Sequence, residues 1–237
     1  MTRPDAAAVI VAAGRGVRAE GAGEGEGPKQ YRMVGGVRML LRAIRPFASH
    51  PRVGPIVVVL PPADAAAPPD WLRPLTSDRL RLVAGGAARQ ESVSLGLAAL
   101  PRDVAIVLVH DAARPFVDKE LIDRVIAVAE LGVCAVPGVP LSDTVKETDT
   151  AGLVVRTVPR ERLVAVQTPQ AFPRDLLETA HQKARADASL SATDDAALCE
   201  RLGQPVRVVP GNPRNIKVTT RDDFAQAEAI AALEAVA

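Results

Sequence analysis

Glycines and fixed positive charges in the first thirty residues form a combination that could handle the phosphates of a nucleotide. An apolar run at 6–11 leads into Ala12-Ala13-Gly14, and Arg18 and Lys29 follow. Glycine allows backbone N–H groups to approach phosphate oxygens closely, and cationic side chains neutralise charge that builds up during phosphoryl transfer. The pattern predicts a nucleotide-phosphate loop beside Arg18 and Lys29. Taken alone, Lys29 would equally fit a solvated lysine.

Two well-known phosphate-binding loops do not fit this stretch. No Lys-Ser or Lys-Thr pair follows a glycine, as the P-loop requires. Residues 14–19 match the dinucleotide pattern G-x-G-x-x-A, but that pattern needs a helix to open at its last glycine. Residues 20–27 have glycine at every second position, which destabilises a helix. The dinucleotide-binding interpretation is therefore excluded.

A second charged pair, Asp111 and Arg114, follows an apolar run at 104–109. A carboxylate at the end of a strand can hold Mg²⁺ through one oxygen while triphosphate oxygens and water complete the shell. An arginine nearby could bind a second phosphorylated substrate in a bidentate manner. The alternative is an ordinary turn closed by an Asp111–Arg114 pair, and the residues alone do not separate the two.

Small and polar residues mark three further sites where strands are expected to end. Gly86 and Ser92 stand where a strand meets a helix, so backbone groups there could recognise a base edge; the alternative is a turn with Ser92 as the helix cap. Thr168 offers a hydroxyl after another apolar run, and Lys217 lies in a short apolar setting. Alone, these two would fit an ordinary turn and a surface lysine.

The spacing of apolar residues indicates the strands and helices that must position these residues. Most β-branched runs are apolar at consecutive positions, which is typical of strands buried on both faces. Helical spacing lies between them: Asp118 is an expected N-cap, Phe172-Pro173 is expected to open a helix, and Thr220-x-x-Asp223 resembles a capping box. This alternation predicts an α/β fold with a doubly wound, mainly parallel, Rossmann-like sheet and ligands at the carboxyl ends of its strands. The expected strands span 6–12, 56–60, 80–83, 104–109, 133–136, 163–166 and 206–209.

One segment breaks the alternation. Residues 141–158 indicate two polar strands around a turn at 149–152, within an arm at 139–160. A lone two-stranded hairpin is only marginally stable in water, so the arm needs a support. A second copy of the chain is the simplest candidate, and we expect a homodimer formed through the arm.

The composition narrows the class of protein. A chain of 237 residues with 48% hydrophobic content fits one large α/β domain, and a net charge of +1 gives no support for nucleic-acid binding. Cys134 and Cys199 are expected to be buried free thiols, and the three histidines have no metal-ligand spacing. No apolar run reaches the length of a membrane span and residues 1–10 lack a signal-peptide layout, so we expect a cytoplasmic protein.

Together the motifs are far more specific than any one of them. In chain order they are VAAGRGxR, PKQY, GGxxRxxSVxxGL, HDAARPF, SDTVK, QTPQ, TDDA and NIKVTT. This order closely resembles the 2-C-methyl-D-erythritol 4-phosphate cytidylyltransferases of the non-mevalonate isoprenoid pathway. The resemblance implies transfer of CMP from CTP to methylerythritol phosphate with release of pyrophosphate, aided by Mg²⁺ or another divalent cation. It also implies a single α/β domain, here residues 1–237, whose protruding arm pairs two subunits.

The resemblance also implies a role for each matching residue. Arg18 and Lys29 match the pair that stabilises the pentacoordinate phosphorus and the triphosphate, and Lys217 and Asp111 hold the metal, the phosphates and the attacking group. Nucleotide contacts, chiefly through backbone, fall on Ala12, Ala13, Gly14, Gly86, Arg89, Ser92 and Asp111. Methylerythritol phosphate contacts fall on Arg114, Thr144, Arg160 and Thr168.

The chain departs from the family at a few positions, and two other functions compete. The loop between Arg18 and Lys29 is longer than usual, Ala87 replaces an acidic residue of some members, and no fused cyclodiphosphate synthase domain is expected. A cytidylyltransferase for another polyol phosphate, such as ribitol 5-phosphate, would share the nucleotide loop. Such relatives tend to carry Ala-Gly-Gly at 12–14 and to lack the TDDA run. A non-catalytic nucleotide sensor would be expected to have lost the cations that this chain retains.

Overall fold

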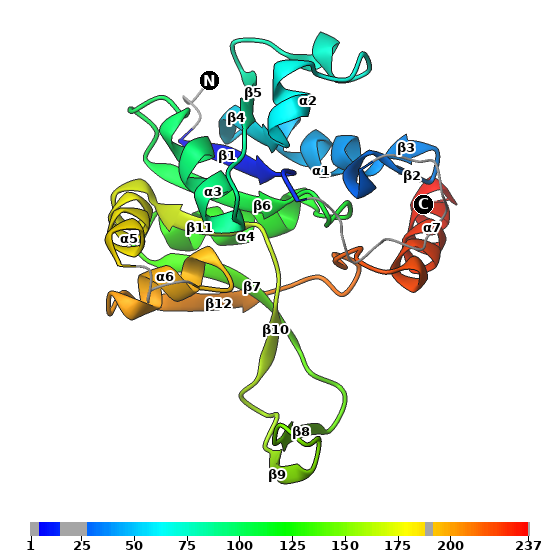
Figure 1. Ribbon diagram of the computed structural model, residues 1–237, viewed down its shortest axis with the longest axis vertical. Coiled ribbons are helices and arrows are strands. Elements are labelled where there is room, and N and C mark those ends of the chain that lie inside the picture. Colours follow the sequence, from blue (N-terminus) through cyan, green and yellow to red (C-terminus); the bar gives the residue numbers. More distant parts are fainter. Residues whose placement is uncertain (1–4, 15–27, 188–191, 237) are drawn as a thin grey trace.

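The computed structural model of the chain describes residues 5–14, 28–187 and 192–236, and within them one mixed sheet forms the centre (Figure 1). Its strand order is β10-β7-β11-β6-β1-β4-β5, with β12 also paired to β7. Strands β6, β1, β4 and β5 are mutually parallel, and β12 is parallel to β7. The strands are β1 (Ala6–Val11), β4 (Val53–Leu60), β5 (Leu80–Ala84), β6 (Ile106–Asp111), β7 (Cys134–Pro140), β10 (Val164–Val166), β11 (Gln170–Pro173) and β12 (Val206–Pro210).

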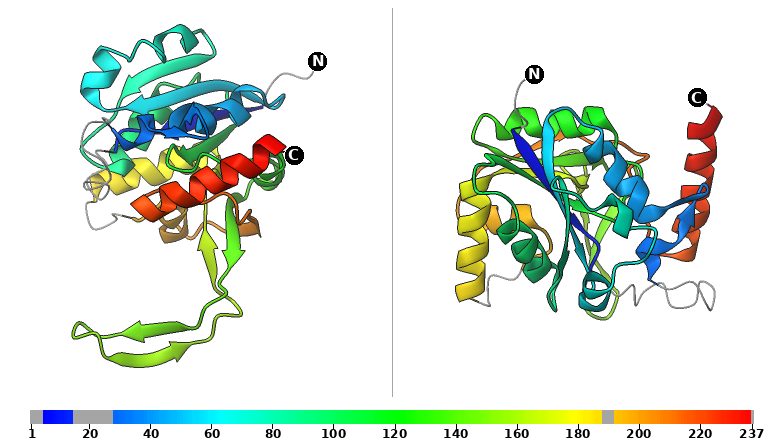
Figure 2. Two further views of the ribbon diagram at one scale, coloured as in Figure 1. Left: turned by 90° about the vertical axis from the view of Figure 1, so that its right-hand side faces the viewer. Right: turned by 90° about the horizontal axis from the view of Figure 1, so that it is seen from above.

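Helices cover both faces of this sheet, as Figure 2 shows. Helices α1 and α4 share one apolar cluster with the even-numbered residues of β1, and α3, α5 and α6 share another with its odd-numbered residues. Short elements and the helix α7 complete the body. The helices are α1 (Met39–Ala48), α2 (Pro62–Ala66), α3 (Arg89–Ala98), α4 (Lys119–Ala129), α5 (Arg174–Ala186), α6 (Asp195–Arg201) and α7 (Arg221–Val236), and the short elements are η2 (Lys29–Tyr31), β2 (Met33–Val34), β3 (Val37–Arg38) and η3 (Arg73–Leu75).

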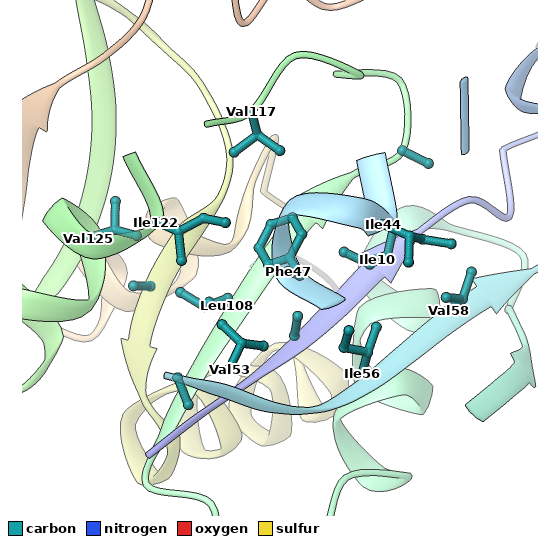
Figure 3. Packing of buried hydrophobic residues seen from close by; sticks show 14 of the residues in the cluster. Ile10, Ile44, Phe47, Val53, Ile56, Val58, Leu108, Val117, Ile122 and Val125 are labelled. Atoms are coloured by element: carbon teal, nitrogen blue, oxygen red, sulfur yellow. The ribbon is translucent and has the colours of Figure 1, made fainter. Parts of the chain in front are cut away.

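Tight packing fixes the helices on the sheet. Phe47 of α1 is fully buried and lies among Ile10, Ile44 and Leu108 (Figure 3). On the opposite face, Gly96 lets α3 approach β1, because a Cβ at this position would lie 2.5 Å from Val9 Cγ1. Both contacts hold the carboxyl end of β1, where the segment Ala12-Ala13-Gly14 begins, in a fixed place.

Most of the predicted elements are confirmed, and one strand of the central sheet is missing from the prediction. The Asp118 carboxylate accepts from Leu121 N as the N-cap of α4, and Asp223 accepts from Thr220 N in the capping box of α7. The strand β11 was not expected. It pairs antiparallel with β6 and β7, so Phe172 lies in a strand rather than at a helix start, and Pro173 is the N-cap of α5, which begins at Arg174. The doubly wound, mainly parallel fold is confirmed.

The expected hairpin is confirmed as an arm that projects from the body (Figure 1). Its strands are β8 (Val145–Thr148) and β9 (Val154–Val158), paired antiparallel. Asp149 closes the turn by accepting from Ala151 N and Leu153 N. Leu153, Val154 and Val155 are 68%, 60% and 60% exposed, so the arm leaves apolar side chains in solvent that a partner could cover.

Two expectations from composition can be compared with the described part of the chain. Cys134 and Cys199 are free and buried, as predicted. None of the described helices combines the length and the apolar character that crossing a bilayer requires.

Candidate active site

A pocket of about 680 Å³ opens where β1 and β6 end and where the chain enters α3. This is the edge at which a parallel sheet is expected to bind its ligand. A second hollow of about 860 Å³ lies along the outer edge of β5 and contains none of the predicted site residues. The first pocket is therefore the candidate site. Its lining includes the predicted residues Ala12, Ala13, Gly14, Lys29, Gly86, Arg89, Ser92, Asp111 and Lys217.

Two backbone segments form a narrow wall of this pocket, and glycine lets them approach each other. A Cβ at Gly85 would lie 2.4 Å from the Cβ of Ala13, so only glycine fits there. Ser92 Oγ accepts from Gly86 N at 3.2 Å and donates to Ala88 O at 3.0 Å. The hydroxyl thus holds the Gly85-Gly86 turn in shape. The alternative of Ser92 as the helix cap is wrong, because Ala88 is the N-cap of α3 and has no side-chain cap bond.

The segment that begins at residue 28 places a lysine in the lining of the pocket. Lys29 Nζ donates to Val218 O at 2.8 Å, which places its ammonium next to the Lys217 segment. The neighbouring Gln30, only 4% exposed, donates from Nε2 to Ala12 O at 2.8 Å. Gln30 is a site residue that our sequence reasoning missed. Its only signal was its place in the PKQY motif. Arg18 lies outside the described residues.

A cluster of charges surrounds Asp111 at the end of β6. Lys217 Nζ lies 2.7 Å from Asp111 Oδ2, and Arg89 Nε lies 3.2 Å from Oδ1. Burial alone would raise the pKa of Asp111, but the charges of Arg89 and Lys217 lower it well below its usual range. Asp111 is therefore ionised at every pH at which the protein would work.

The side chains of the pocket suit a divalent cation that is bound by phosphate oxygens as well as by the protein, rather than by the protein alone. No cluster of three or more potential ligand side chains occurs in the described part of the chain, and Asp111 is the acidic residue that lines the pocket. Mg²⁺ in phosphate-binding sites is held through one or two carboxylates, substrate oxygens and water. The pocket fits this mode, and Asp111 is the side chain that could serve as the protein ligand.

A buried histidine is connected to the backbone of Asp111 through the hydroxyl of Thr168. His110 Nε2 lies 3.0 Å from Arg114 O, and its Nδ1 lies 3.0 Å from Thr168 Oγ1, which also accepts from Asp111 N. A carbonyl only accepts, so Nε2 carries the proton and Nδ1 accepts from the Thr168 hydroxyl. Burial lowers the pKa of His110 to about 4, in keeping with this neutral tautomer.

His110 is expected to make stability fall in mildly acidic solution. An unfolded histidine takes up a proton near pH 6.5, whereas folded His110 does so near 4, so protons favour the unfolded chain between these values. We expect the unfolding free energy of the metal-free protein to be about 2 kcal/mol lower at pH 4.5 than at pH 7 through His110 alone.

Urea unfolding at both pH values measures this difference, and His110→Gln should remove most of it. Histidine-selective NMR on the unaltered protein gives an independent check that needs no variant. An imidazole of His110 that titrates near pH 6.5 in the folded protein contradicts the assignment.

The residues expected to bind a second substrate are distributed over two places. Arg114 N donates to Asp111 O at 2.9 Å, so the turn of the alternative interpretation is present. The guanidinium does not close it by pairing with the Asp111 carboxylate, and donates instead to Asn215 O at 2.8 Å and Val166 O at 3.2 Å. Thr168 is buried beneath the pocket with its hydroxyl engaged as described. Thr144 and Arg160 are exposed at the base of the arm, where Arg160 donates to Ser142 O, and no described residue of the arm lines the pocket.

Known proteins of similar sequence indicate the family of the chain. The model of the family "IspD: 2-C-methyl-D-erythritol 4-phosphate cytidylyltransferase" matches residues 6–232. A bifunctional enzyme IspD/IspF of Chelativorans sp. is 45% identical over 223 residues, covering 94% of this chain and 54% of the relative. Another, from Rhodopseudomonas palustris strain HaA2, is 46% identical over 226 residues, covering 95% of this chain and 55% of the relative. The chain thus spans about half the length of the curated relatives it matches.

Solved structures extend the likeness to the whole fold. The 2-C-methyl-D-erythritol 4-phosphate cytidylyltransferase of Thermus thermophilus is 37% identical with a TM-score of 0.78, covering 95% of this chain and 98% of that one. The 4-diphosphocytidyl-2C-methyl-D-erythritol synthase of Anaerococcus prevotii is 30% identical with a TM-score of 0.81, covering 94% of both chains. The family model spans nearly the whole chain and the fold agrees along it, so the chain belongs to the IspD family of 2-C-methyl-D-erythritol 4-phosphate cytidylyltransferases.

Proposed function

We propose that this protein transfers CMP from CTP to 2-C-methyl-D-erythritol 4-phosphate, giving 4-diphosphocytidyl-2-C-methyl-D-erythritol and pyrophosphate. The observation that carries the proposal is the meeting of Lys29, Lys217 and Asp111 with two glycine-containing backbone segments in one pocket. Family membership supports the choice of nucleotide and acceptor. One catalytic domain would span residues 1–237.

The reaction needs neutralisation of charge more than a general base. The phosphate of the acceptor is already an anionic nucleophile, and the difficulty is to bring it onto the α-phosphate of another polyanion. Lys29 and Lys217 lie in the pocket as fixed cations, and positioning with such charges accounts for most of the catalysis in phosphoryl transfer. Arg18 would add a third cation. Mg²⁺ or another divalent cation, held by Asp111 and the triphosphate, would neutralise charge on the departing pyrophosphate.

Backbone groups are well suited to select the base. The segments 12–14 and 85–88 line the pocket, and Gln30 and Ser92 fix their orientation. Carbonyl oxygens there could accept from the exocyclic amine of cytosine. Uracil would present its own carbonyl in the same place, and unpaired buried acceptors would disfavour it.

The proposal includes an assembly and a place in the cell. The exposed apolar residues of the arm at 139–160 would pair two subunits, and Thr144 and Arg160 would contact the acceptor together with Arg114 and Thr168. The enzyme would work in the cytoplasm, where the buried thiols Cys134 and Cys199 stay reduced.

Pyrophosphate release from purified protein tests the function directly. We expect release with CTP, Mg²⁺ and methylerythritol phosphate, and little with UTP in place of CTP or ribitol 5-phosphate as acceptor. Faster release with ribitol 5-phosphate would assign the alternative polyol substrate. Tight CTP binding without any release would indicate a nucleotide sensor, and either result overturns the proposal.

A further inference from the structure

Arg89 joins the pocket to a carboxylate that lies outside it. As the first residue of α3, Arg89 donates through Nε to Asp111 Oδ1 at 3.2 Å and through Nη1 to Asp195 Oδ2 at 2.7 Å. Asp195 is the first residue of α6, is 1% exposed and does not line the pocket. Arg89 thus divides its guanidinium between two carboxylates, and its ion pair with Asp195 is the shorter one.

Capping of α6 does not explain why Asp195 is charged. The neighbouring Asp194 is the N-cap, accepting from Ala197 N, and Gln170 donates to it. The Asp195 carboxylate faces inward instead, where His181 Nε2 of α5 lies 3.0 Å from its Oδ1. Buried ion pairs contribute little net stability compared with apolar side chains of similar size, so a purely structural site would not need this charge.

The chain of ion pairs from Lys217 through Asp111 to Arg89 is balanced in charge only when Asp195 is counted. Lys217 and Arg89 supply two positive charges, and Asp111 and Asp195 two negative ones. Burial would raise the pKa of Asp195, but Arg89 and His181 lower it, so the carboxylate remains ionised. Without it, Asp111 would be the remaining carboxylate that pairs with Arg89 among the described residues, and the planar guanidinium fork matches a carboxylate in a bidentate manner.

We propose that Asp195, oriented by His181, is a positioning residue that restrains Arg89 so that Asp111 stays available to a divalent cation and the nucleotide. This inference rests on the proposed function. Loss of the Asp195 charge would let Arg89 close on Asp111 and leave this chain of ion pairs with one uncompensated positive charge beside the triphosphate, in addition to that of Lys29. Cation-assisted binding would weaken while binding of metal-free nucleotide would strengthen.

Calorimetric titration of CTP into Asp195→Asn, with and without Mg²⁺, tests this without turnover. We expect metal-free CTP to bind roughly tenfold more tightly than to wild type, and Mg²⁺ to lose most of its enhancing effect. In the release assay, the Mg²⁺ concentration for half-maximal rate should rise about tenfold, while KM for the acceptor stays unchanged. Asp195→Glu, which keeps the charge, should restore much of both properties, and His181→Gln should show a weaker form of the defect.

Glu178→Gln is the matched control, because it breaks the 2.7 Å pair with Arg174 on the same helix as His181, away from the pocket. It should bind CTP as wild type does. The proposal is overturned if Asp195→Asn loses CTP affinity equally with and without Mg²⁺, or is unchanged in both. If Asp195→Asn does not fold, wild-type behaviour of folded His181→Gln overturns it. A wild-type protein that binds Mg²⁺ and CTP but releases no pyrophosphate contradicts the proposed function instead.

Discussion

Replacing Lys29 by alanine is expected to lower kcat by about 10²–10³-fold while changing the KM for CTP much less. Before nucleotide binds, the Lys29 ammonium already donates to Val218 O at 2.8 Å inside the pocket. Ground-state binding exchanges this bond for one with phosphate, so the net gain is small. The negative charge that develops around the α-phosphate in the transition state is then stabilised by a cation that is already in place.

Initial rates over a range of CTP and acceptor concentrations separate the two constants. Lys183→Ala removes an exposed lysine near the end of α5 and serves as the control, with wild-type rates expected. From the motif alone we expect Arg18→Ala to behave as Lys29→Ala does. A Lys29→Ala enzyme whose entire defect lies in the KM for CTP would show that the lysine binds substrate and transition state equally, contrary to the assigned role.

The elements that the sequence predicted best are those whose pattern is local. Apolar β-branched runs identified β1, β4, β5, β6 and β12. The side-chain caps of α4 and α7 could also be recognised, because each joins residues only three positions apart. The strand β11 was missed because it has only four residues, Pro169 precedes it and Pro173 is its last residue. Its pairing with β6 and β7 is non-local, and periodicity carries no information about such a partner.

The same division between local and distant contacts holds for the site. The motifs identified nine of the residues that line the pocket, and their convergence followed from the rule that parallel strands end at one edge. Contacts between distant segments were not visible. Arg89 and Asp195 are 106 positions apart, and His110 meets Thr168 across 58 positions. Single residues such as Gln30 acquire a role only when the fold brings their side chain to a backbone atom of another segment.

Subunit mixing is expected to restore activity to two inactive variants, Lys29→Ala and Arg160→Ala. Arg160 is exposed at the base of an arm none of whose described residues line the pocket of the same chain. An isolated hairpin is marginal in water, and its exposed apolar residues suit a self-complementary contact between two copies. An arginine carried by such an arm would then serve as a bidentate phosphate ligand in the partner's pocket.

The arrangement of intact residues decides the outcome of the mixture. If Arg160 acts across the interface, a mixed dimer has one site with both residues and one site with neither. Random pairing then returns about a quarter of the wild-type activity, because half of the dimers are mixed and each has one working site of two. Two affinity tags confirm that mixed dimers have formed, so an inactive mixture is informative. Lys29→Ala mixed with Lys217→Ala is the matched control, since both residues line the pocket of one chain and every site stays defective. If the Arg160→Ala mixture is equally inactive, Arg160 serves its own chain and the shared site is rejected.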